Sequence, residues 1–110
     1  MPELSSAHSL ENALRDLTDR LRALPESRLV RQVGPAQDLA QRLVEWAHGV
    51  EHRGVIPPSA APELPVVGIF VTADQVAVAG ADLVAVLAQV SAPEVLAAAA
   101  AAVAELRAQL

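Results

Sequence analysis

The 110-residue chain has no cysteine, no tyrosine and no lysine. Apart from the histidines, its only aromatic residues are Trp46 and Phe70. The absence of thiols excludes disulfides, cysteine nucleophiles and thiolate metal sites. There is also no Gly-rich phosphate loop and no Gly-x-Ser-x-Gly turn that would expose a nucleophilic serine. Because no cluster of catalytic groups appears, we predict no enzymatic activity and no cofactor.

Basic residues are few and are all arginine, which leaves a formal net charge of −5. An acidic chain is poorly suited to binding the phosphates of nucleic acid, so no nucleic-acid partner is predicted. The use of arginine alone, together with the abundance of alanine, suggests a bacterial source.

A long apolar stretch from Val66 to Val90 raises the question of a membrane span. Asp74 and Asp82 interrupt it, and each would cost roughly 3 kcal/mol near the centre of a bilayer. The N-terminus has early acidic residues and lacks the apolar core of a secretory signal. The sequence therefore predicts a cytoplasmic protein with no membrane association.

Apolar periodicity indicates helices in the first half of the chain. Between residues 9 and 24 leucines recur at alternating spacings of four and three, which places them on one stripe of a helix that ends at Pro25. Residues 26–33 are expected to form a short helical turn before Gly34-Pro35. A second helix is predicted from 35 to 52, with an apolar face at Leu39, Leu43, Trp46 and Val50.

The second half follows a proline-rich crossover at residues 54–65. The β-branched run at 66–71 and the short run at 76–79 predict a β-hairpin around residues 66–79. The spacing of Thr72 and Gln75 leaves open a capping box and one long helix from 73 to 90 instead. Further helices are predicted at 81–90 and from Pro93 onward, where the alanine run is a strong helix former.

These elements predict a mainly α fold, a small bundle of about four helices with a short β-hairpin. The chain is expected to form a single domain over residues 1–110. Within it lie a helical half at 1–53, the crossover at 54–65 and an apolar half at 66–110.

Two histidines, His48 and His52, lie four residues apart on the second predicted helix and share one side of it. Both point away from the apolar face, so we interpret them as part of an ordinary solvated helix surface and predict no metal site. They are nevertheless the candidates for a surface Zn²⁺ site.

The apolar content is large for so short a chain, and both faces of the predicted hairpin are apolar. A second chain is expected to cover them, because exposed sheet edges and apolar faces promote association. We therefore predict a small interaction or scaffold protein that forms homo-oligomers. The expected interface residues are Leu14, Leu17, Leu21, Val67 and Ile69.

Two alternatives stay open from the sequence. One is a ligand- or metal-sensing regulatory module that uses His48 and His52. The other is a subunit of a hetero-complex, in which a partner protein covers the half that is rich in valine and alanine.

Overall fold

The computed structural model describes residues 6–53, 60–68 and 70–110 of the chain. Within these ranges every regular element is a helix, and no strand is present. The mainly α-helical bundle predicted from the sequence is therefore confirmed. The predicted hairpin is not.

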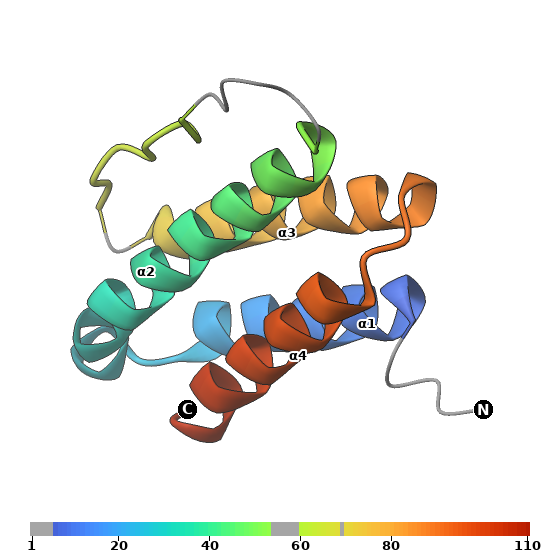
Figure 1. Ribbon diagram of the computed structural model, residues 1–110. Coiled ribbons are helices and arrows are strands. Elements are labelled where there is room, and N and C mark those ends of the chain that lie inside the picture. Colours follow the sequence, from blue (N-terminus) through green and yellow to red (C-terminus); the bar gives the residue numbers. More distant parts are fainter. Residues whose placement is uncertain (1–5, 54–59, 69) are drawn as a thin grey trace.

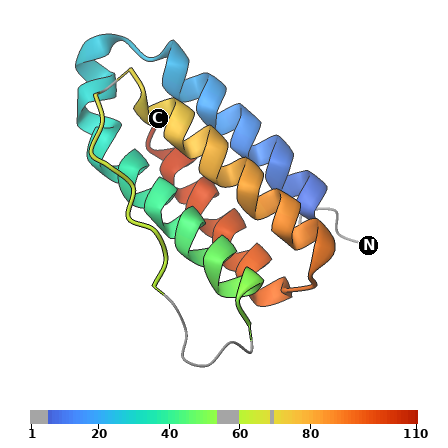
Figure 2. The same cartoon turned by 90° about the horizontal axis from the view of Figure 1, so that it is seen from above.

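Four helices follow one another through the described residues (Figure 1): α1 at Ala7–Ala23, α2 at Glu26–Glu51, α3 at Thr72–Gln89 and α4 at Pro93–Ala108. Helix α3 is central, because it packs against both α2 and α1 and lies between them in Figure 2. Helix α4 lies mainly against α1. Arg22 near the end of α1 pairs with Asp74 in the first turn of α3 at 2.8 Å, so these two helices run antiparallel. None of the described helices is both long enough and apolar enough to cross a membrane.

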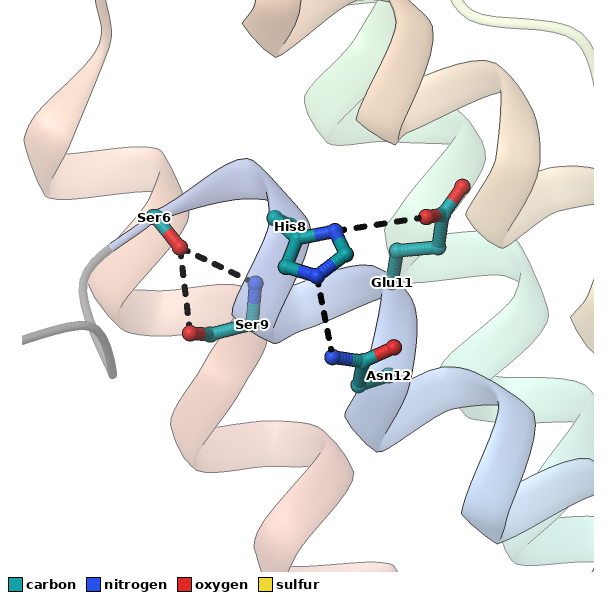
Figure 3. A network of polar contacts seen from close by, with 5 residues as sticks. All are labelled: Ser6, His8, Ser9, Glu11 and Asn12. Carbon is teal, nitrogen blue, oxygen red and sulfur yellow. Dashed lines mark hydrogen bonds and ion pairs between the residues drawn. The ribbon is translucent and has the colours of Figure 1, made fainter.

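The start of α1 is fixed by a small polar network at the surface (Figure 3). Ser6 caps the helix: its hydroxyl oxygen accepts a hydrogen bond from the Ser9 backbone N–H and lies 3.0 Å from Ser9 Oγ. The imidazole of His8 lies 3.8 Å from a Glu11 carboxylate oxygen and 3.4 Å from the Asn12 amide nitrogen. The first backbone N–H groups of a helix have no intrahelical acceptor, and the Ser6 hydroxyl supplies one of the missing acceptors.

The leucine stripe of α1 lies at the centre of the core, as its spacing predicts. Leu17 and Leu21 are completely buried, and Leu10 and Leu14 nearly so. The helix ends where Leu24 adopts an extended backbone, the conformation favoured before a proline.

Helix α2 corrects the predicted break at Gly34-Pro35. The short turn expected at 26–33 and the helix expected at 35–52 are one continuous helix of 26 residues, with Pro35 inside it. A proline in a helix interior costs about 3 kcal/mol. Because Leu29 and Leu39 are buried on either side of it, each supplying roughly 1.5–3 kcal/mol by burial, the continuous apolar face outweighs that cost.

Helix α3 shows that the hairpin predicted around residues 66–79 is wrong. The chain is helical from Thr72 onward, close to the long-helix alternative that the sequence left open. Val76 and Leu83 are completely buried at a spacing of seven residues, which fits the helical period. The helix propensity of a valine is at most about 0.7 kcal/mol worse than that of alanine, less than the gain from burying one such side chain.

Between α2 and α3 the described residues 60–68 form an extended segment that lies beside both helices (Figure 2). We call residues 60–68 the strap. They belong in part to the predicted crossover at 54–65, of which residues 54–59 lie outside the described ranges. The organisation of the chain as a single domain stays a prediction.

Candidate interaction surface

Large apolar side chains are exposed around the beginning of α3. Val66 is 89% exposed, Phe70 72% and Val78 63%, and Val71 at the N-cap is also exposed. Gln75 in the first turns of α3 donates a hydrogen bond to the carbonyl oxygen that directly precedes Val66, which keeps this part of the strap beside the helix. Phe70 and Val71 thus directly precede the first residue of α3, and Val78 lies about two turns inside the helix.

The same side of α3 carries further apolar residues along its length, with Asp74 and Gln89 among them. After Val71 and Val78, the exposed residues Ala81, Ala85 and Ala88 continue at spacings of three and four. At 100° per residue all five positions fall within about 100° of the helix circumference, opposite the buried residues. We call Val71, Val78, Ala81, Ala85 and Ala88 the outer face of α3.

Helix α3 is therefore apolar on two opposite sides. One side carries the buried residues Val76 and Leu83, and the other carries the outer face. A helix that is apolar all round is normally covered on all sides. In this bundle the α1, α2 and α4 helices leave the outer face uncovered.

A charged group lies on the outer face. Asp74 lies within its arc, and its carboxylate binds the Arg22 guanidinium of α1 at 2.8 Å with both side chains largely exposed. Beside the face, a cleft of about 210 Å³ separates α3 from α1 and is lined by Leu14, Thr18 and Ala81 among others. The outer face is therefore mainly apolar but carries one carboxylate, which is paired with the Arg22 guanidinium.

The leucines expected at an interface lie elsewhere. Leu14, Leu17 and Leu21 are buried in the core formed by this chain's own helices. Val67 in the strap is half-buried, and Ile69 lies outside the described residues. Leu14, Leu17 and Leu21 therefore have an intramolecular role here, and a contact with another chain through them stays a prediction.

Sequence reasoning missed Val78 and the three alanines. It assigned residues 76–79 to a strand, in which alternate side chains point to opposite faces. Only a helical period places Val78 and the three alanines in line with Val71. The signal was present in the sequence but becomes visible only when the whole segment is treated as one helix.

The two candidate metal ligands, His48 and His52, stack with ring centroids 4.1 Å apart. His52 is exposed, and its Nδ1 lies 2.9 Å from the His48 carbonyl oxygen, which it reaches as a donor. His48 is half-buried because it lines a cleft of about 460 Å³ between α2 and α3, together with Glu51 and Asp82. Across the described part of the chain, no three histidine, aspartate or glutamate side chains are grouped so as to hold a metal ion.

One acidic group has a shifted pKa. The hydrogen bond from the Arg53 guanidinium at the end of α2 lowers the pKa of the Glu94 carboxyl below its ordinary value. A backbone hydrogen bond in the first turn of α4 acts in the same direction. The pair joins two helices that otherwise share little packing.

The chain was compared with models of known protein families, with curated proteins and with solved structures, and none of the three comparisons gives a match.

Proposed function

We propose that the protein is a non-catalytic interaction module that associates with a second copy of itself through the outer face of α3. The observation that supports this proposal is the second apolar side of α3, which carries Val71 and Val78 in line with three exposed alanines. Covering a valine side chain contributes roughly 1.5–3 kcal/mol relative to leaving it in water.

The distribution of side-chain sizes favours a second copy as the partner. The valines occupy the N-terminal part of the outer face, and the alanines occupy its C-terminal part. In an antiparallel pair related by a two-fold axis beside Ala79 and Gly80, Val71 of one copy faces Ala88 of the other. In the same arrangement Val78 faces Ala81. The valines then meet alanines, whereas Ala85 faces Asp74 and its ion pair with Arg22, and helices carrying alanine can approach closely.

The test is the absolute mass in solution, measured by size-exclusion chromatography with light scattering over a concentration series. We expect the unmodified protein to form a dimer. Val78→Asp should weaken the dimer by about tenfold or more, because a carboxylate would be buried without a partner. Circular dichroism of the variant should keep the helical signal, since Val78 makes no part of the buried core.

The matched control is Val30→Asp. Val30 is 54% exposed and lies on α2, away from the outer face, so its variant should dimerise normally. A protein that stays monomeric at every concentration would overturn the proposal and favour a foreign partner. Equal loss of the dimer in the Val30 and Val78 variants would also contradict it.

A further inference from the structure

The strap is held by glutamine side chains rather than by secondary structure of its own. The side-chain amide of Gln41 on α2 makes two hydrogen bonds to the backbone of the strap. Its oxygen accepts from the Leu64 N–H at 2.8 Å, and its nitrogen donates to the Pro62 carbonyl oxygen at 3.0 Å. One side chain thus supplies the donor and the acceptor that a neighbouring β-strand would offer.

Two more glutamines meet one residue later in the strap. Gln37 on α2 and Gln75 on α3 each donate to the carbonyl oxygen of Pro65, at 3.4 and 2.9 Å. Hydrogen bonds from both helices therefore hold the strap segment Pro62-Glu63-Leu64-Pro65. We call Gln37, Gln41 and Gln75 the glutamine site.

All four hydrogen bonds go to backbone atoms of the strap. The Pro62, Glu63 and Pro65 side chains are exposed, and Leu64 alone of these four residues packs partly against the core. The glutamine site therefore selects an extended backbone with one apolar side chain, and flanking prolines favour such a conformation in advance. Any segment with these properties presents the same groups.

The strap leaves one hydrogen-bond acceptor of the glutamine site without a donor. The amide oxygen of Gln75 is buried and has no hydrogen-bond partner among the described residues. A buried acceptor without a donor costs free energy, and the prolines of the strap have no N–H to supply. A different extended segment with an N–H at that point would bind with one more hydrogen bond.

From these contacts we infer that the glutamine site is a binding site for an extended, proline-bracketed segment of a partner protein, and that the strap occupies it in cis. This inference concerns a surface separate from the outer face of α3 and does not depend on self-association. A tethered occupant competes at an effective concentration in the millimolar range, so the site is masked until the strap is displaced.

The experiment uses the full chain and a fluorescein-labelled synthetic peptide with the sequence of residues 60–67, AAPELPVV. Fluorescence polarisation measures its binding to the unmodified protein and to Leu64→Asp, in which the strap loses its apolar anchor. We expect binding to Leu64→Asp that is about tenfold tighter or more, because the competing occupant has been weakened. A peptide with aspartate in place of its leucine should bind to neither.

Two variants in the Leu64→Asp background locate the peptide. Gln41→Ala should abolish binding, because it removes both backbone hydrogen bonds of that amide. Gln89→Ala is the matched control, since Gln89 is exposed at the far end of α3, and it should bind as Leu64→Asp does. Equal binding by Gln41→Ala would overturn the inference.

A second measurement decides the question if Leu64→Asp does not fold. Unlabelled peptide at about 1 mM is added to the isotope-labelled unmodified protein, and the backbone N–H signal of the protein's own Leu64, which bonds to Gln41 in the structure, is followed by NMR. A shift of the Leu64 signal without a shift of the Gln89 signal would show that the peptide displaces the strap and would support the glutamine site. No shift of the Leu64 signal, or the same shift at Gln89, would overturn it.

Discussion

Gly80 on α3 lies directly against Leu14 on α1. A Cβ atom added to Gly80 would stand 2.8 Å from Leu14 Cδ1, 3.0 Å from Cδ2 and 3.3 Å from Cγ. All three atoms belong to the Leu14 side chain, which is buried in the core and would have to move to admit a methyl group here. The absence of a side chain at Gly80 therefore sets how closely the two helices pack.

Gly80→Ala should lower the free energy of unfolding by about 1 kcal/mol, because overpacking of about 1–3 kcal/mol exceeds the gain in helix propensity of about 1 kcal/mol. Combining it with Leu14→Ala should cost less than the sum of the two single changes, since the smaller side chain makes room. Urea denaturation of the three variants measures this coupling. Gly49→Ala, where nothing lies within 4 Å of the added Cβ, is the control and should be neutral or stabilising.

Pro35 interrupts the hydrogen bonding of α2, so Pro35→Ala should stabilise the protein by about 1–2 kcal/mol. The gain from restoring the backbone N–H exceeds the added entropy of the unfolded chain, about 0.4–1 kcal/mol. The control is Pro93→Ala at the first position of α4, where the missing N–H has no intrahelical role. Thermal unfolding followed by circular dichroism compares the two, and a Pro35 variant that melts no higher than the Pro93 variant would contradict the prediction.

The Arg53–Glu94 pair makes the stability of the folded protein depend on pH, and the direction of the Glu94 pKa shift fixes the sign of that dependence. Because the pKa of Glu94 is lowered in the folded protein, its contribution to stability is present above the ordinary glutamate pKa and is lost as pH falls through the lowered value. Glu94→Gln should therefore reduce the melting temperature more at pH 7 than at pH 3. The difference between the two pH values should be smaller in an Arg53→Gln background, because the hydrogen bond that lowers the pKa of Glu94 is then absent.

The proposed antiparallel dimer can be tested by cross-linking, because the chain has no cysteine of its own. In Val71→Cys/Ala88→Cys the two thiols of one chain are separated by most of α3 and cannot pair with each other. Oxidation should link them between chains and give a covalent dimer on a non-reducing gel. Val71→Cys alone should give little dimer, and strong linkage by that single variant would indicate a different register.

The accuracy of the sequence reasoning varied from helix to helix for physical reasons. In α1 the leucine spacing, the helix propensities and the proline stop agree, so the helix and its buried face were predictable. In α3 the local preferences of Val76, Val78 and Gly80 oppose a helix. Burial against other helices overrides those preferences, and that energy depends on tertiary contacts that the local pattern does not contain.

The two surfaces proposed for binding were hidden from the sequence for related reasons. Val78 joins the outer face only if residues 72–89 are one helix. The glutamine site joins Gln41 to Leu64 over 23 positions and depends on where the strap crosses α2. Neither the glutamines nor the strap carries a pattern that predicts this pairing.

The central place of α3 also has a consequence for synthesis of the protein. Helices α1 and α2 emerge from the ribosome before α3, yet they pack on α3 more than on each other. Leu17 and Leu43, which are completely buried in the finished bundle, therefore lack their cover until α3 has been made. At about 5–20 residues per second, the 37 residues from Arg53 to Gln89 leave these apolar faces open for about 2–7 seconds. Helices α1 and α2 can bury these faces as they are buried in the finished bundle only after α3 has been made.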